Sequence, residues 1–222
     1  YLKIDVSCYG YLDGTIDLSI LGGMTPYTYV WSNGATIEDI SGLIAGTYFV
    51  TIIDVTNDSI MEAFSITEPP PISLSFITTD VSCYGSNDGM AIVVPTGGSN
   101  FYVEEYWANI VFGDTISNLS AGWYFVSVTD SSGCTGMDSI EIIEPSEIDI
   151  TGFITDASNA GTTDGSIYIT VSGGISPYLY SWDNGETLDS IDGLSTGIYR
   201  LSVTDDNGCI AIDSFEVGIV LP

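Results

Sequence analysis

The sequence predicts an all-β protein of three tandem immunoglobulin-like antiparallel β-sandwich domains arranged as an extended rod. Three observations favour this fold class. The dipeptide Asp-Gly recurs at Asp13, Asp88 and Asp164, a step of 75 and then 76 residues (88 − 13 and 164 − 88), and a period of that length is typical of tandem domains. Apolar and polar residues alternate in short runs, as in half-buried strands. Turn dipeptides separate the runs, and no window has a convincing helical period.

The repeats are expected to occupy residues 1–70, 71–145 and 146–222. Prolines directly after Glu68 and Glu144 mark the joins, and because proline fixes φ, each join should be stiff and extended. Repeat sequence begins almost at the first residue, without the charged and apolar regions of a signal peptide. We therefore expect the chain to be an internal piece of a longer protein.

Within each repeat, the strand after Asp-Gly should bury alternate residues, which are Ile16, Leu18 and Ile20 in the first copy. A Gly-Gly turn, a strand that ends in tryptophan, and a later strand that begins with tyrosine follow in order. Six or seven such strands per repeat are typical of an immunoglobulin-like sandwich. The recurring aromatic positions are Trp31, Trp107 and Trp182, and Tyr48, Tyr124 and Tyr199.

Each repeated tryptophan is expected to fill the centre of its sandwich, as one tryptophan does in immunoglobulin-like domains. The alternative is a platform on which sugar rings stack. The repeated tyrosines follow a glycine at a strand start, so they resemble the tyrosine corner of such sandwiches. Their hydroxyls should then serve structure.

The second repeat differs from its neighbours in one strand. Eight residues separate Gly98 from Trp107, against seven in the other two copies. Since one extra residue would turn every side chain to the wrong face, we expect a β-bulge near Glu104. Trp123 and Phe125 should point outward from a later strand and form a partner patch, with lateral packing as the alternative.

Composition excludes several function classes. Thirty acidic residues against Lys3 and Arg200 give a net charge of −28, which repels nucleic acid and anionic membranes. No run of about 18 apolar residues is present, so no membrane insertion is expected. The chain has no histidine, the commonest general base. The adjacent pair Glu104 and Glu105 should face opposite sides of a strand, so we predict no catalytic residues and no enzyme.

The four cysteines fall at two repeat positions, a loop before Asp-Gly and a late hairpin. Only the second repeat has both, so the sequence favours a disulfide between Cys83 and Cys134 in an oxidising compartment. That pairing leaves Cys8 and Cys209 without partners. Four unpaired thiols are the alternative.

Acidic residues gather at turns, and calcium prefers six to eight oxygen ligands. The candidate calcium ligands are Asp54, Asp58, Asp88, Asp205 and Asp206. Aspartate is also an ordinary turn residue, and the spacing matches no known calcium loop. No other cofactor is expected.

The words of the repeat, read in order, resemble the SprB repeat family. They are Cys-Tyr-Gly-x-x-Asp-Gly, Gly-Gly-x-x-Pro-Tyr-x-Tyr-x-Trp-x-Asn-Gly, Ile-Ser-Gly-Leu-x-Ala-Gly-Thr-Tyr, Thr-Asp-x-x-Gly-Cys and a closing Glu-Pro. This family occurs in very large surface adhesins and other secreted proteins of Bacteroidota, exported by the type IX system and moved along the surface of gliding species. Departures are the incomplete cysteine pairs, the rewritten strand of the second repeat and the missing final Glu-Pro.

The resemblance implies an extracellular spacer or adhesive shaft in an outer-membrane-attached filament, with a role in gliding motility and surface attachment. Its partner would be a surface polysaccharide, another cell-surface or substratum ligand, or further copies of itself. A carbohydrate-binding array and a laterally packing structural filament are the alternatives. Asp-Ser/Thr followed by Ile also resembles the O-glycosylation signal of that phylum. The acceptor positions would be Ser59, Thr115, Ser139 and Ser190.

Overall fold

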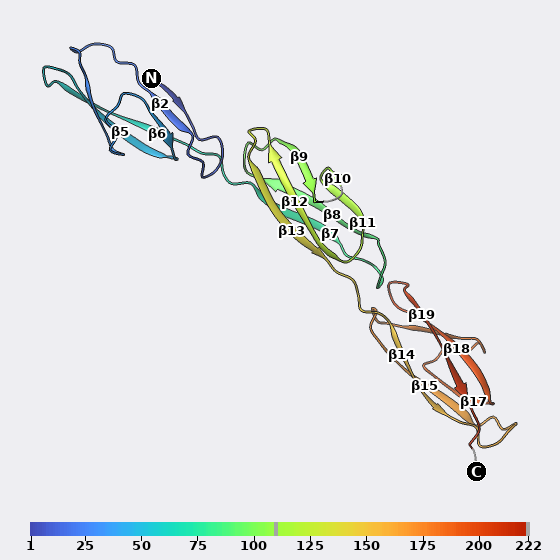
Figure 1. The fold of residues 1–222 in the computed structure, drawn as a ribbon. Coiled ribbons are helices and arrows are strands. Elements are labelled where there is room, and N and C mark those ends of the chain that lie inside the picture. The colour runs from blue at the N-terminus through green and yellow to red at the C-terminus, as the bar shows by residue number, and fades with distance from the viewer. Residues whose placement is uncertain (109–110, 221–222) are drawn as a thin grey trace. The chain divides into compact units, whose positions relative to one another are not determined.

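The computed structural model describes residues 1–108 and 111–220. These residues form nineteen β-strands and no α-helix, so the described chain contains no helix that is long and apolar enough to cross a membrane (Figure 1). The chain divides into two compact units, and the second repeat contributes to both. Unit 1 comprises Tyr1–Ile77, Ile92–Asp114 and Tyr124–Ile140, and unit 2 comprises Thr78–Ala91, Thr115–Trp123 and Glu141–Pro222.

The described strands of the first repeat form two three-stranded sheets. One has the order β1-β2-β4 and the other β3-β5-β6. The strands are β1 (Leu2–Ile4), β2 (Gly14–Asp17), β3 (Thr28–Trp31), β4 (Ile40–Leu43), β5 (Gly46–Ile53) and β6 (Ser59–Ile66). The paired strands with printed register run antiparallel.

The second repeat also has two sheets, with the orders β11-β8-β7 and β10-β9-β12-β13. Its strands are β7 (Ser73–Thr79), β8 (Gly89–Thr96), β9 (Tyr102–Trp107), β10 (Val111–Phe112), β11 (Thr115–Leu119), β12 (Gly122–Asp130) and β13 (Thr135–Ile142). The short β10 is the strand that its neighbours lack.

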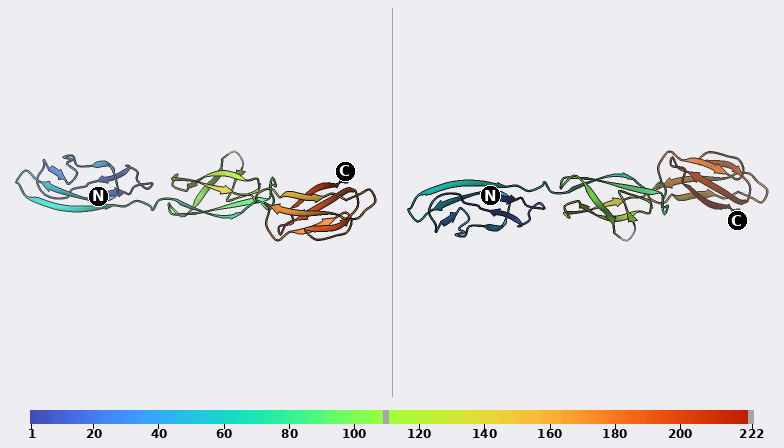
Figure 2. Two further views of the ribbon diagram at one scale, coloured as in Figure 1. Left: turned by 90° about the horizontal axis from the view of Figure 1, so that it is seen from below. Right: turned by 90° about the horizontal axis from the view of Figure 1, so that it is seen from above.

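The third repeat returns to the pattern of the first, with sheets β14-β15-β17 and β16-β18-β19. Its strands are β14 (Asp149–Thr155), β15 (Gly165–Ser172), β16 (Leu179–Trp182), β17 (Ser190–Leu194), β18 (Gly197–Thr204) and β19 (Ile210–Val217). Each of the six sheets takes all of its strands from one repeat (Figures 1 and 2). The fold class is therefore tandem immunoglobulin-like β-sandwiches, as the alternating sequence predicts. The exact domain boundaries at 70 and 145 stay a prediction.

The alternating residues meet between the two sheets. In the first repeat Ile16, Val50 and Trp31 are buried in one cluster, and Ile167 and Leu201 are buried in the corresponding cluster of the third. Burial of alternate residues on each strand removes apolar surface from water, which is the main driving force for folding. The predicted register is confirmed.

The extra residue of the second repeat lies in β9. Thr129 pairs with Glu104, whereas the next residue of β12, Asp130, pairs with Tyr102. Val103 is thus the unpaired residue of a β-bulge, one position from the predicted site. The bulge restores the register, because Trp107 still pairs with an inward residue of β12 and is 1% exposed.

The repeated aromatic residues hold the places that the sequence predicts. Trp31 and Trp182 are each 3% exposed, and each indole Nε1 donates to a backbone carbonyl oxygen at 2.9 Å. The Tyr48 hydroxyl donates to the carbonyl of Ile44 at 3.1 Å, and the Tyr199 hydroxyl to that of Ser195 at 3.0 Å. These are tyrosine corners, so the buried tryptophans leave no platform for sugar at those positions.

Candidate functional site: the repeat junctions

The Asp-Gly word closes the loop that carries the first cysteine position. The carboxylate of Asp13 accepts hydrogen bonds from the backbone N–H, at 3.0 Å, and the hydroxyl of Ser7. Asp88 accepts the N–H of Ser82 at 3.0 Å in the second repeat. The hydroxyl and backbone bonds from Ser7 hold the pKa of Asp13 below its usual value.

The glycine of the same word is required by close packing. A Cβ on Gly14 would lie 2.9 Å from Ile66 Cγ2 and 2.9 Å from the carbonyl oxygen of Leu43. The same clash is present at Gly89 and Gly165. Asp-Gly therefore recurs because the aspartate shapes the cysteine loop while the glycine lets β2, β8 or β15 start against its neighbours.

The linker glutamates hold the cysteine loops from the other side. The Glu68 carboxylate accepts the N–H of Gly10 at 2.7 Å, and that of Glu144 accepts the N–H of Gly85 at 2.6 Å. Sequence reasoning missed this role, although Glu-Pro recurs at a fixed distance after Asp-Gly. In the third repeat the closing Glu-Pro is absent, and Ile219 pairs with Ala157 in a parallel bridge instead.

A second aspartate shapes the hairpin that carries the other cysteine position. Asp130 is 1% exposed, and its Oδ1 accepts the N–H groups of Ser132 and Cys134, each at 2.9 Å. Its Oδ2 accepts the N–H of Ser99 at 2.8 Å. Burial would raise the pKa of Asp130, but the backbone bonds, led by that from Ser99, outweigh burial and lower it.

The same arrangement recurs in the other repeats. Asp54 accepts the N–H of Asp58 at 3.1 Å and that of Met24 at 3.1 Å. Asp205, which is 3% exposed, accepts the N–H of Cys209 at 2.9 Å. These aspartates act as fixed backbone acceptors that bind the hairpin to the Gly-Gly turn.

The linkers pack against the Gly-Gly turns. The N–H of Gly98 donates to the carbonyl of Pro70 at 2.9 Å, and that of Gly174 to the carbonyl of Ser146 at 2.8 Å. A Cβ on Gly97 would lie 2.0 Å from the Pro71 carbonyl oxygen. Only glycine leaves room for the incoming linker at this turn.

Two disulfides join cysteines of different repeats. Cys8 is bonded to Cys134, and Cys83 is bonded to Cys209, each over a sequence separation of 126 residues. The predicted Cys83–Cys134 disulfide is therefore wrong, and so is the expectation that Cys8 and Cys209 lack partners. The described residues contain no free cysteine.

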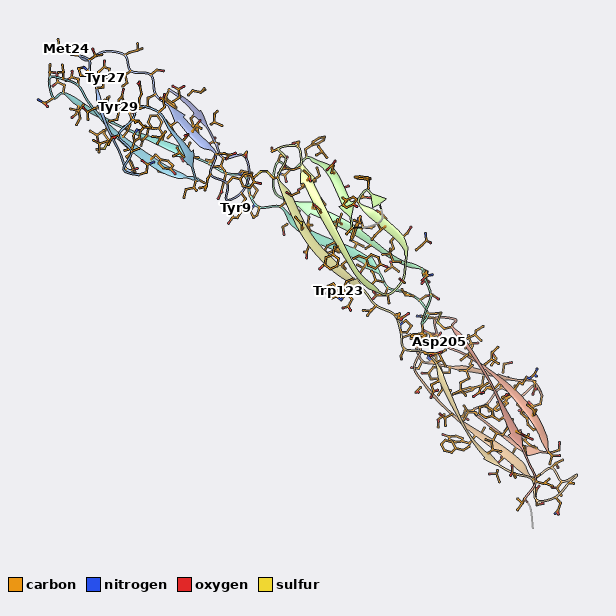
Figure 3. All side chains as sticks on the ribbon, in the orientation of Figure 1. Tyr9, Met24, Tyr27, Tyr29, Trp123 and Asp205 are labelled. Carbon is orange, nitrogen blue, oxygen red and sulfur yellow. A yellow bond between two sulfur atoms is a disulfide. The ribbon has the colours of Figure 1, made fainter. Side chains whose placement is uncertain are left out.

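The position of the loop and hairpin within a repeat explains this correction. In the first repeat Tyr9, beside Cys8, lies at one end of the sandwich, and Met24, which is bonded to the hairpin aspartate, lies at the other (Figure 3). A disulfide requires Cα atoms about 4.4–6.8 Å apart. Two positions at opposite ends of one sandwich cannot meet, so each loop cysteine instead reaches the hairpin cysteine of the next repeat.

Each clasp borders a hollow beside the linker. The hollow near Cys8 and Cys134 measures about 140 Å³ and is lined by the linker prolines. The hollow near Cys83 and Cys209 measures about 530 Å³ and includes Asp205 in its lining. In Figure 3, Asp205 lies at the end of the third repeat from which β14 starts.

The predicted partner patch is exposed. Trp123 and Phe125 are 59% and 58% exposed, and because they alternate with Tyr124 on β12, both leave the same face of that strand. Phe125 also lines an apolar hollow of about 390 Å³ together with Tyr106 and Met137. What contacts this face stays a prediction.

The candidate calcium ligands are distributed over several turns. Asp54 and Asp58 share one turn, where the Thr56 hydroxyl lies 2.7 Å and 3.4 Å from their carboxylate oxygens. Asp88 closes a cysteine loop, while Asp205 and Asp206 belong to the third hairpin. Within residues 1–108 and 111–220, no group of three or more acidic or cysteine side chains is arranged to hold a metal ion.

The predicted O-glycosylation positions lie on strands. Ser59, Thr115 and Ser190 are exposed and each begins a strand, and Ser139 is half-buried within β13. Three of the four hydroxyl positions are therefore open to solvent. Their modification stays a prediction.

The adjacent glutamates of β9 face opposite sides, as expected. Glu105 pairs with the buried Val128 and is half-buried, while Glu104 is exposed. Burial, with a smaller contribution from the charge of Asp114, raises the pKa of Glu105. Carboxylates that leave opposite faces of one strand cannot act on one bond.

Comparison with known families identifies the repeat. The SprB repeat matches the chain over residues 4–36, 75–103 and 151–187, once in each repeat. The matched segments cover the cysteine loop, the Asp-Gly word and the start of the Gly-Gly region. No curated protein sequence matches the chain.

Solved structures with similar folds are immunoglobulin-domain proteins. The N-terminal eight Ig domains of Down Syndrome Cell Adhesion Molecule match 89% of this chain and 33% of their own, at 11% identity and a TM-score of 0.35. Sidekick-1 immunoglobulin domains 1–5 match 89% and 56%, at 13% identity and a TM-score of 0.32. The amphioxus IgVJ-C2 molecule matches 58% and 94%, at 13% identity and a TM-score of 0.29. This chain thus spans a third of the first of these, and the fold assignment rests on its own sheets.

Proposed function

We propose that this chain, which carries three SprB repeats, is a non-enzymatic spacer and adhesive shaft segment of a long repetitive cell-surface protein. The observation that carries the proposal is the junction. The same linker glutamate, Gly-Gly turn and disulfide join the first repeat to the second and the second to the third. A chain that invests its repeated residues in joints is suited to hold successive repeats together.

The family adds the setting. Resemblance to SprB proteins favours an extracellular protein that is exported by the type IX system and attached at the outer membrane, with a role in gliding and attachment. Two disulfides agree with an oxidising compartment. The net charge of −28 favours mutual repulsion between neighbouring filaments and solubility.

Surface labelling of the source cells tests this proposal. An antibody raised against residues 1–222 should stain intact cells, and external protease should remove the staining. Cells with an in-frame deletion of this segment should still export the protein but attach less firmly to a surface. Staining that requires lysis of the cells would contradict the proposed location.

Carbohydrate binding is a second candidate, favoured by the exposed aromatic side chains of β12. Trp123 and Phe125 offer flat apolar surface of the kind on which sugar rings stack. On a glycan array, Trp123→Ala or Phe125→Ala should abolish binding, while Phe153→Ala, at an equally exposed aromatic residue of β14 (59%), should not. Equal binding by all variants would contradict this candidate. Loss of self-association in Trp123→Ala, with no glycan bound, would instead favour lateral packing of copies.

A further inference from the structure

We propose that the two disulfides make this chain a redundant tether, whose greatest extension is set covalently and is nearly kept when either bridge is lost. The proposal concerns the mechanics of the chain. It stands independently of whether the chain serves at a cell surface.

The two disulfide-closed loops overlap. One bridge closes the chain between Cys8 and Cys134, and the other between Cys83 and Cys209. Cys83 lies inside the first loop and Cys134 inside the second. Neither loop is nested in the other, so the covalent path through the oxidised chain crosses both bridges.

The shortest covalent path sets the length when the chain is pulled from its ends and its noncovalent structure gives way. From the first residue the path runs to Cys8 and crosses to Cys134. It then returns along the chain to Cys83, crosses to Cys209 and continues to the last residue. The three stretches contain 7, 51 and 13 peptide steps (8 − 1, 134 − 83 and 222 − 209).

These 71 steps compare with 221 in the reduced chain (222 − 1). At about 3.4 Å per residue, the oxidised chain reaches about 240 Å and the reduced chain about 750 Å. The disulfides therefore withhold about two thirds of the possible extension.

The overlap also makes the tether tolerant of damage. Either bridge alone leaves 95 steps (221 − 126), or about 320 Å. Losing one bridge thus adds only about 80 Å, whereas losing both adds about 510 Å. A single bridge within the second repeat, between Cys83 and Cys134, would leave 170 steps (221 − 51), or about 580 Å.

The path also decides which repeat extends. Residues 9–82 and 135–208 lie off it, and they include β2–β6 of the first repeat and β14–β18 of the third. Strands β8–β12 of the second repeat lie on the path, between Cys83 and Cys134. The central repeat is the extensible element, and the two outer sandwiches keep all but one strand each.

Single-molecule force spectroscopy on the full chain tests the proposal, with handles attached through cysteine-free tags at both ends. The oxidised chain should extend to about 240 Å and, after a thiol reductant is added, to about 750 Å. The double variants Cys8→Ser/Cys134→Ser and Cys83→Ser/Cys209→Ser should each reach about 320 Å when oxidised.

Because the final length depends on the covalent path alone, a variant that folds poorly still gives a valid reading. An oxidised chain that reaches about 750 Å would overturn the proposal by showing that no bridge forms. A length near 580 Å would overturn it by showing a bridge within the second repeat. A large difference between the two double variants would refute the redundancy.

Discussion

Alanine in place of Gly173 tests whether the linker packs against the third repeat. Gly173 has a φ of +75°, and a Cβ there would lie 1.8 Å from the carbonyl oxygen of Glu147, whereas real Cβ atoms essentially never approach a heavy atom within 3.0 Å. The linker or the turn would have to move by about 1.2 Å (3.0 − 1.8). Gly22 is the matched control, because it holds the same place in the first repeat, has a φ of +98°, and its Cβ would meet nothing within 4 Å.

The two substitutions separate the backbone cost from the steric cost. Alanine in the left-handed region costs about 1–2 kcal/mol at either position, and overpacking adds about 1–3 kcal/mol at Gly173 alone. We expect Gly22→Ala to lower the opening free energy of the first repeat by about 1–2 kcal/mol. Gly173→Ala should lower that of the third repeat by about 2–5 kcal/mol.

Hydrogen exchange read by mass spectrometry measures these free energies for each repeat separately, because opening is local. In Gly173→Ala, the amides of β14 and β15 should exchange faster while those of the first repeat keep their protection. Equal losses at Gly22 and Gly173 would refute the reasoning, since they would leave nothing for the Glu147 contact to explain.

Three further predictions follow from the acidic turns and the surface hydroxyls. Backbone and hydroxyl bonds from Ser158, with a further bond from Thr162, lower the pKa of Asp164 from 3.8 to about 2; a lowered folded-state pKa gives stability that is present above the unfolded value and lost as pH falls from about 4 to 2. Acid titration of the third repeat should show this loss, and Asp164→Asn should flatten it; an unchanged titration in the variant would contradict the assignment. If calcium binds the acidic turns, the melting temperature should rise with added calcium and return with a chelator, and a temperature that ignores both would exclude the site. If the exposed strand-start hydroxyls such as Ser59 are glycosylated, native material should exceed the bare chain mass, and a bare mass would contradict modification.

Much of the fold could be predicted because the sequence repeats its own pattern. Alternation on one strand predicts which residues, such as Ile16 and Leu18, face the core, and both are buried. Counting residues between Gly98 and Trp107 predicts a bulge, since one extra residue must be absorbed to keep the tryptophan inside. Both inferences use only positions close together in the chain.

The junctions could not be predicted in the same way. Alignment of the copies shows that Cys83 and Cys134 occupy two positions of one repeat, but it does not show that these positions lie at opposite ends of the sandwich. The informative signal was the pattern of absences. Asp58 replaces the hairpin cysteine of the first repeat and Asn159 the loop cysteine of the third, which is what staggered pairing between successive repeats requires.

Disulfide mapping of the unreduced chain tests the central claim most directly. Trypsin has only Lys3 and Arg200 as cleavage sites, so proteases that cut at aspartate and glutamate are needed. Mass spectrometry should find Cys8 linked to Cys134 and Cys83 linked to Cys209. A peptide that links Cys83 to Cys134, with free thiols at Cys8 and Cys209, would contradict the account.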